Sequence, residues 1–294
     1  MPDQAVKDAI ALYDRFTHEG GMDRRELLAA MTRIAGGSAA AAMMLSSIAC
    51  SATAPQVAPD DDRIRTGASA WQAPSGRRYQ LYDARPANAS ATTPLVIVIH
   101  ENRGLNDYIR DVARRLAVAG FVAAAPDLLS PEGGTPADED RAREMIGALD
   151  LSRTVADGAA MIRALGANGG ARRAVGIVGF CWGGAMVNRL AVAAGSDLAA
   201  GVAFYGPAPD PSEAARVQAP LLLHYAGLDT RVNETGEAWV AALRAAHKDV
   251  TAITYPNVNH AFHNDTSPAR YDRDAAERAW TATIEFLRRH LGRG

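Results

Sequence analysis

Residues 175–184 constrain the fold of this chain more than any other stretch. They begin with Val-Gly-Ile-Val, a short, apolar and largely β-branched run that is typical of a buried strand in a parallel sheet. Residues 185–193 have a helix-forming composition. Between the two, Gly179-x-Cys181-x-Gly183 predicts a sharp strand-to-helix turn with a strained, exposed central residue, because glycines on either side let the helix approach the strand.

The cysteine at this turn has two readings. A helix N-terminus favours thiolate over thiol, which would make Cys181 a nucleophile, with the backbone N–H of Trp182 pointing at the group it attacks. Alternatively, Cys181 is a small buried hydrophobic residue and the glycines only shape the turn. The strand–turn–helix context favours the nucleophile, and the presence of a base and an acid elsewhere would decide between the readings.

Strands and helices alternate through the rest of the chain, which predicts a largely parallel sheet with helices on both faces and ligands beyond the carboxyl ends of the strands. The alternating pattern at residues 77–83 predicts an antiparallel edge strand. Further strands are predicted at residues 95–99, 120–127, 201–206, 220–225 and 250–255. Helices are predicted at residues 106–119, 141–149, 152–165, 234–246 and 267–291.

An acid and a histidine follow two of these strands. Asp229 comes after the strand that ends at Tyr225, and His260 comes after the strand at residues 250–255. A thiol nucleophile needs a base to take its proton and a third group to orient that base. Nucleophile, acid and base follow one another here in the chain order of the α/β-hydrolase triad. The sequence therefore predicts an α/β-hydrolase fold.

Each partner of Cys181 has a competing interpretation. Asp229 would also suit a turn or a helix N-cap, and Asp249 and Asp265 are less well placed acids. His263 is the nearest competitor of His260, although it should point elsewhere on the loop. The presence of all three residue types at matching strand ends favours the triad.

Several motifs together resemble one family, the dienelactone hydrolases (carboxymethylenebutenolidases), which are α/β-hydrolases with cysteine in place of serine. The resemblance implies Cys181 as nucleophile, His260 as general base and then acid, and Asp229 as the group that orients His260. It covers roughly residues 77–291 and rests on these motifs: Gly-Phe-Cys181-Trp-Gly-Gly, His100-Glu101-x-x-Gly104-Leu105-Asn106, Gly-x-Asp229 and His260-x-Phe262.

The resemblance also implies that Glu101 lies beside the thiol and switches it between resting and thiolate states. It further implies an oxyanion hole made by the backbone N–H groups of Asn102 and Trp182. Physical chemistry supports Glu101 independently, because a poorly solvated carboxylate near the nucleophile can accept or return a proton. The alternative is a solvated loop acid.

The family type holds the carboxylate of dienelactone with two arginines, and here the pattern departs. Asn264 stands near the first position, with Arg270 in the same segment, and Arg143 or Arg141 could match the second. The aromatic residues expected near the second position are absent from residues 146–148. We therefore expect Arg143 and Arg270 as candidate substrate-binding residues in a different pocket, which argues against dienelactone itself.

The predicted reaction is hydrolysis of a small carboxylic ester or lactone through a thioester acyl-enzyme. With a net charge of -2 and no basic, aromatic-interleaved patch, nothing favours nucleic acid. No metal or organic cofactor is called for, and a homo-oligomer stays open. Two alternatives are a thiol-redox protein, which would need a resolving cysteine although only Cys50 is present besides Cys181, and a non-catalytic binding protein on a hydrolase scaffold.

The N-terminal segment also has two interpretations. Apolar residues at helical spacing predict an amphipathic helix within residues 1–22. Arg24-Arg25, an alanine-rich stretch and a small-residue run that ends at Ala54 resemble a twin-arginine export signal, without a stable membrane span. We expect a signal-like segment at residues 1–54, a linker at 55–76 and the hydrolase-like domain at 77–294. Periplasmic export is favoured over a helical arm that stays on a cytoplasmic enzyme.

Overall fold

A mixed sheet forms the centre of the molecule in the computed structural model, which describes residues 4–19, 22–48, 54–167 and 172–292. Its strand order is β1-β2-β4-β3-β5-β6-β7-β8. The pairs β1–β2 and β2–β4 are antiparallel, and all the others are parallel. The strands are β1 (Ile64–Gln72), β2 (Arg78–Pro86), β3 (Leu95–Ile99), β4 (Val122–Asp127), β5 (Val175–Phe180), β6 (Ala200–Phe204), β7 (Leu221–Ala226) and β8 (Val250–Tyr255).

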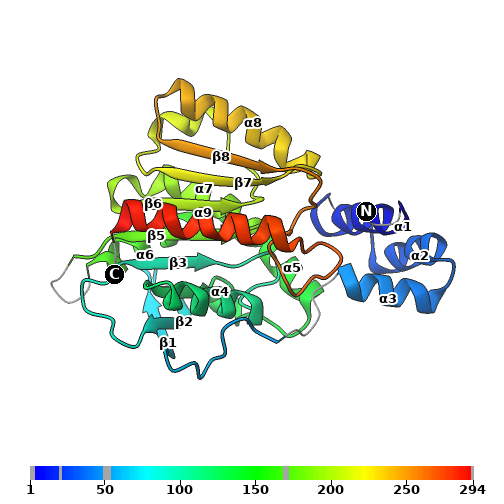
Figure 1. Ribbon diagram of the computed structural model, residues 1–294, viewed down its shortest axis with the longest axis horizontal. Coiled ribbons are helices and arrows are strands. Elements are labelled where there is room, and N and C mark those ends of the chain that lie inside the picture. Colours follow the sequence, from blue (N-terminus) through cyan, green and yellow to red (C-terminus); the bar gives the residue numbers. More distant parts are fainter. Residues whose placement is uncertain (1–3, 20–21, 49–53, 168–171, 293–294) are drawn as a thin grey trace.

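Helices cover both faces of the sheet (Figure 1). One face carries α4 (Asp107–Val118) and α9 (Arg273–Leu291). The opposite face carries α6 (Leu151–Gly166), α7 (Trp182–Ala193) and α8 (Thr230–Ala245), while α5 (Glu139–Gly147) lies over a smaller cluster. The alternation of elements thus correctly predicted a largely parallel sheet with helices on both faces, and the architecture is that of the predicted α/β-hydrolase fold (Figure 1).

The central strands are buried on both faces. In β3, Val96 and Val98 pack into the core under α4 and α9, whereas Leu95 and Ile97 pack into the core under α6, α7 and α8. Every residue of β3, β5, β6 and β7 is buried. Because neither face meets water, these strands are continuous apolar runs, which explains why the sequence revealed them.

Two expectations for the start of the sheet are wrong. β1 lies within residues 55–76, which were predicted to be a linker, and it forms the edge of the sheet. β2 is antiparallel as expected, but it lies between β1 and β4 and is not the edge strand. Most residues of β1 are exposed, so polar and small side chains occupy it and no apolar alternation marks it as a strand.

The N-terminal residues form a separate group of helices beyond the carboxyl ends of the parallel strands (Figure 1). The group consists of α1 (Gln4–Asp14), the π-helical η1 (Arg15–Glu19), α2 (Arg24–Ala35) and α3 (Ser38–Ile48). It has its own small core, which includes Ile10, Leu27 and Met31. We name this group the N-terminal helices.

The signal-like motif falls on regular structure in these helices. The side chain of Asp23 caps α2 and forms a reciprocal capping box with Glu26, so that Arg24 and Arg25 occupy the first turn. Gly36 then ends α2 in the left-handed conformation, with φ of 74°. Cys50 lies outside the described residues.

No single helix of the described residues is both long and apolar enough to cross a membrane. Taken together, the adjacent helices α2 and α3 are long and apolar enough to cross a membrane, but the chain bends by 108° between them.

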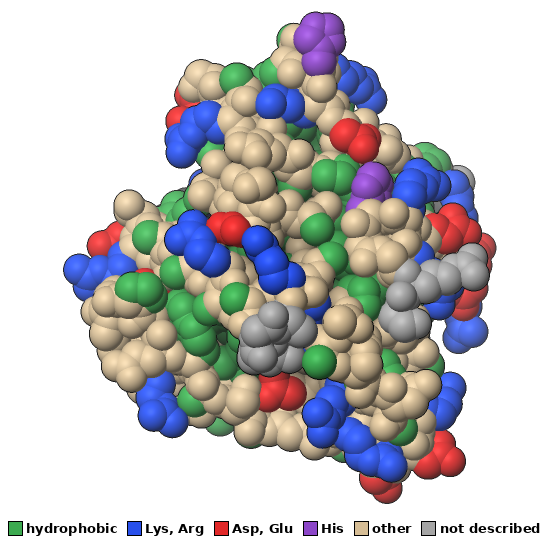
Figure 2. All heavy atoms as spheres, turned by 90° about the vertical axis from the view of Figure 1, so that its left-hand side faces the viewer, with side chains coloured by type: hydrophobic (Ala, Val, Ile, Leu, Met, Phe, Trp, Pro, Cys, Tyr) green, Lys and Arg blue, Asp and Glu red, His purple; other side chains and the backbone are tan. Residues whose placement is uncertain are grey.

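The face at the opposite end of the molecule from the N-terminal helices is shown in Figure 2. Basic and acidic side chains are interspersed over it, together with scattered apolar ones. Among the described residues of this face, basic side chains lie near acidic ones, which does not favour a polyanion.

Candidate active site

The turn between β5 and α7 has the strained backbone that the sequence predicts, but the expected exposure of its central residue is wrong, because Tyr13, Glu101 and His260 line the small pocket around Cys181. Cys181 has φ of 55° and ψ of −116°, a conformation that L-residues rarely adopt, and its side chain is 5% exposed. A Cβ on Gly179 would collide with the backbone carbonyl of Gly183, and one on Gly183 would collide with the carbonyl of Ile99. Both glycines are thus required for the helix to start directly beside the sheet.

Asp229 and His260 meet at the carboxyl ends of β7 and β8. His260 Nδ1 lies 2.5 Å from Asp229 Oδ2, and both side chains are buried. The other carboxylate oxygen of Asp229 accepts a 3.3 Å hydrogen bond from the N–H of Val232. Asp229 therefore caps α8, as the alternative interpretation held, and also holds the ring of His260.

The charges of this cluster favour a protonated His260. Burial acts to lower the pKa of His260, but its interactions with Cys181 and with Asp229 outweigh burial and raise the pKa to about 10. Burial would likewise raise the pKa of Asp229, yet the attraction of His260 brings it below the ordinary value. The arrangement stabilises an imidazolium at His260, beside the carboxylate of Asp229 and the sulfur of Cys181.

Glu101 is buried just after β3, in the same pocket as Cys181. Burial raises the pKa of this carboxyl, although Arg103 and His260 oppose the shift. Asn264 Nδ2 donates a 2.8 Å hydrogen bond to Glu101 Oε2. The family resemblance predicts an arginine near position 264. This chain has Asn264 there, and its amide binds the carboxyl group of Glu101.

Two residues near Cys181 have roles that sequence reasoning missed. The buried ring of His100 contacts the carbonyl of Glu101 through Nδ1 at 2.7 Å and accepts a hydrogen bond from the N–H of Leu128 at 3.2 Å. Tyr205 has φ of 38° at the end of β6, and its ring centroid lies 5.0 Å from that of His260. Both residues directly follow central strands, and this position in the sequence could have identified them as neighbours of the site.

The competing residues have other partners. Tyr108 Oη lies 2.7 Å from His263 Nδ1, and burial lowers the pKa of His263 well below its ordinary value. Asp265 forms an ion pair with Arg115 at 2.6 Å. The structure therefore brings Asp229 to His260, and neither His263 nor Asp265 takes part in that contact.

Cys181 borders two cavities. The first has a volume of about 30 Å³ and also contacts Glu101, His260 and Arg270. The second, of about 320 Å³, contacts Trp182 and Arg143. Asn102 lines both cavities, so the two candidate oxyanion residues border the space beside the sulfur, whereas the two candidate substrate arginines lie in different cavities.

Comparisons with known proteins identify the family of this chain. The model of the dienelactone hydrolase family matches residues 80–291. A protein of Escherichia coli K12 named as a carboxymethylenebutenolidase is 33% identical over 247 residues, which cover 79% of this chain and 90% of the relative.

Solved structures give the same result. A structure from Klebsiella pneumoniae, titled as a dienelactone hydrolase, has a TM-score of 0.66 at 30% identity and covers 76% of this chain and 98% of its own. A dienelactone hydrolase-like promiscuous phosphotriesterase from metagenomic libraries has a TM-score of 0.66 at 27% identity and covers 77% and 99%. This chain belongs to the dienelactone hydrolase family and is a carboxylic ester hydrolase.

Proposed function

We propose that the enzyme hydrolyses a small carboxylic ester or lactone with a Cys181–His260–Asp229 triad and a thioester acyl-enzyme. The observation that carries the proposal is the contact between Asp229 and His260 beside a cysteine held in a strained turn at a helix N-terminus. The interaction with Cys181 that raises the pKa of His260 supports a thiolate–imidazolium pair.

Acylation starts from the pair in which the thiol proton of Cys181 has already moved to His260. The thiolate attacks the carbonyl carbon, and a carbon–sulfur bond forms as the carbonyl electrons move to oxygen. When the tetrahedral intermediate collapses, the bond from carbon to the alcohol oxygen breaks and His260 returns the proton to that oxygen. Water then attacks the thioester carbonyl while His260 takes a proton from it. The carbon–sulfur bond breaks, the acid is released, and His260 returns the proton to the sulfur of Cys181.

The oxyanion is expected to bind the backbone N–H groups of Trp182 and Asn102. Trp182 is the first residue of α7, where N–H groups have no partner within the helix. The contact of His100 with the carbonyl of Glu101 fixes the backbone directly before Asn102. One oxyanion donor typically lowers the barrier by about 2.7–4 kcal/mol. Loss of either N–H group should therefore reduce activity nearly as much as loss of the base.

Glu101 is proposed to exchange a proton with the thiol. Its raised pKa makes a neutral carboxyl accessible, and Asn264 keeps one carboxylate oxygen in place. Thiolate chemistry favours esters and lactones over amides, because a thiolate leaves the intermediate more readily than an amine does.

Substitution of the sulfur tests the nucleophile. Cys181→Ala should lower kcat/KM for p-nitrophenyl acetate by at least about 10³-fold, since loss of a nucleophile removes the covalent path. Cys181→Ser keeps the side-chain size and serves as the control for folding, with both melting temperatures close to that of the wild type. An alanine variant that retains activity within about tenfold of wild type would refute the assignment.

A further inference from the structure

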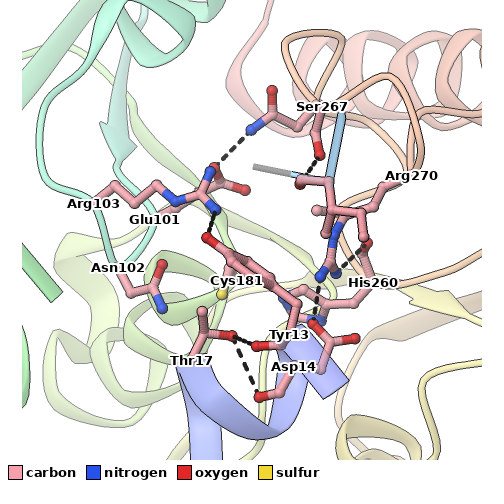
Figure 3. Close-up of a pocket in the computed structure, with 13 residues that line it drawn as sticks. Tyr13, Asp14, Thr17, Glu101, Asn102, Arg103, Cys181, His260, Ser267 and Arg270 are labelled. Atoms are coloured by element: carbon pink, nitrogen blue, oxygen red, sulfur yellow. Dashed lines mark hydrogen bonds and ion pairs between the residues drawn. The ribbon is translucent and has the colours of Figure 1, made fainter. Parts of the chain in front are cut away.

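The N-terminal helices contribute side chains to the candidate active site. Tyr13, Asp14 and Thr17 line the small cavity beside Cys181, and Figure 3 shows them approaching it from the side opposite Glu101 and Arg103. These residues precede the matched family region, which begins at residue 80. This wall of the pocket is therefore an addition to the family domain.

Three arginines of the hydrolase domain converge on this wall. Arg103 donates a 2.9 Å hydrogen bond to the hydroxyl of Tyr13. Arg143 donates a 3.2 Å hydrogen bond to the carbonyl of Phe16, and its guanidinium lies 4.2 Å from the centre of the Phe16 ring. These cation–π and charge-assisted contacts hold residues 13–16 of the N-terminal helices against the arginines beside the site.

Arg270 makes the contact with the greatest consequence for binding. It is 5% exposed and forms a 2.8 Å ion pair with Asp14, and it also donates a 3.4 Å hydrogen bond to the carbonyl of His260 (Figure 3). A buried guanidinium needs a nearby anion, because an uncompensated buried charge is costly. Within the described residues, the carboxylate that meets this need is Asp14.

The end of α3 is fixed to the same loop of the hydrolase domain. Ser267 Oγ donates a 2.6 Å hydrogen bond to the carbonyl of Ile48, and the N–H of Ala269 donates a 3.0 Å hydrogen bond to the carbonyl of Ser47. The N-terminal helices thus contact both the residues directly before Arg270 and Arg270 itself, which keeps Asp14 at its guanidinium.

The space left beside this ion pair is small. The cavity that contacts Asp14, Arg270 and His260 has a volume of about 30 Å³, room for about two water molecules or one carboxylate group, whereas the other cavity beside Cys181 has about 320 Å³. A substrate group of any size must therefore occupy the larger cavity, and only a small group fits beside Asp14.

We propose that Asp14 is a specificity-determining residue. By occupying Arg270, it excludes a substrate carboxylate from the His260 side of the site, so that the enzyme selects esters or lactones that are small and uncharged on that side. The proposal deepens the proposed function and rests on it for its kinetic test. It also assigns Arg270, a candidate for substrate binding, to a contact within the chain.

The test compares full-length Asp14→Asn with the wild type on p-nitrophenyl acetate and on the anionic p-nitrophenyl hydrogen succinate. The substitution should raise the ratio of kcat/KM for the succinate ester over the acetate about tenfold, through a lower KM. Asp8→Asn, the same change at an exposed position of α1, should leave the ratio unchanged. The double variant Asp14→Asn/Arg270→Gln should lose the gain. A ratio within twofold of the wild type in Asp14→Asn would overturn the proposal.

A binding measurement separates this proposal from the proposed function. Succinate should raise the melting temperature of Asp14→Asn and leave that of the wild type and of the double variant unchanged, with uncharged succinamide as the ligand control. A wild type without esterase activity would contradict the proposed function, while the succinate shift would still support the role of Asp14. Equal shifts in all three proteins would overturn that role.

Discussion

At the scale of single residues, the proposed chemistry depends on where the proton of Cys181, the proposed nucleophile, is held. His260 is buried, which alone would favour the neutral ring, yet Cys181 and Asp229 raise its pKa to about 10. Glu101 lies in the same pocket, and burial raises its pKa. His260 therefore keeps its proton readily, and Glu101 accepts a proton more readily than an exposed glutamate would.

The raised pKa of His260 predicts how activity depends on pH. The ring must be protonated to release an alkoxide as its alcohol, so kcat/KM for an alkyl ester, followed by the release of acid, should not fall near the ordinary value of 6.5 but only as the pH approaches about 10. Since the folded-state pKa exceeds 6.5, protonation of His260 also stabilises the fold below 6.5, and this contribution is lost as pH rises through about 10.

A pH–rate profile of the wild type checks this expectation. Asp229→Asn should move the descending limb to lower pH and reduce the rate by on the order of 10²–10⁴-fold, because the ring loses both its charge partner and its orientation. A descending limb near pH 6.5 in the wild type would contradict the assigned environment of His260.

The strand-end residues could be predicted from sequence, whereas most of their neighbours could not. Cys181, Asp229 and His260 each follow a recognisable apolar strand, and the carboxyl ends of parallel strands meet at one edge. Asn264 and Asp14 are different, because each acquires its role from a partner more than 150 positions away, Glu101 at one and Arg270 at the other. No local pattern encodes such contacts.

At the scale of elements, the strand–turn–helix unit of β5 and α7 depends on backbone contacts without side chains. A Cβ on Gly183 would meet the carbonyl oxygens of Ile99 and His100, which belong to the backbone of β3 and the loop after it and cannot rotate away. The pattern Gly-x-Cys-x-Gly was therefore informative because each glycine answers a specific steric demand.

Replacement of this glycine should be costly. We expect Gly183→Ala to destabilise the protein by about 1–3 kcal/mol through overpacking and to reduce activity by displacing the start of α7. Gly67→Ala in β1 is the matched control, since nothing lies within 4 Å of a Cβ there. Urea unfolding of the two variants compares them directly, and equal stability of both with the wild type would show that the turn tolerates a side chain.

The accuracy of the prediction differed between the other elements, mainly because they differ in burial. β8 was predicted with its observed bounds, and the buried strands were found because their runs are apolar throughout. β1 was missed because an edge strand exposed to water needs few apolar residues. The last helix begins at Arg273, later than the predicted residue 267, since Ser267 and its neighbours form the turns that hold Ile48 and Arg270.

At the scale of the whole molecule, the first 54 residues have two interpretations, an export signal and a helical arm that stays on the enzyme. The twin-arginine-like motif stays a prediction of export, and cleavage after such a signal would remove Tyr13 and Asp14 from the pocket. The contacts of Asp14 with Arg270 and of Tyr13 with Arg103 give the same residues a role on an enzyme that keeps them. With the role that we propose for Asp14, the substrate range of the full chain would depend on its N-terminal segment.

The most direct test of the central claim is the intact mass of the full-length protein, quenched in acid at early times of reaction with p-nitrophenyl acetate. We predict one added acetyl group per chain, located at Cys181 by peptide mapping, released by hydroxylamine and absent from Cys181→Ala. Steady turnover without an acetylated protein at any quench time, or an acetyl group on the alanine variant during turnover, would contradict a thioester acyl-enzyme at Cys181.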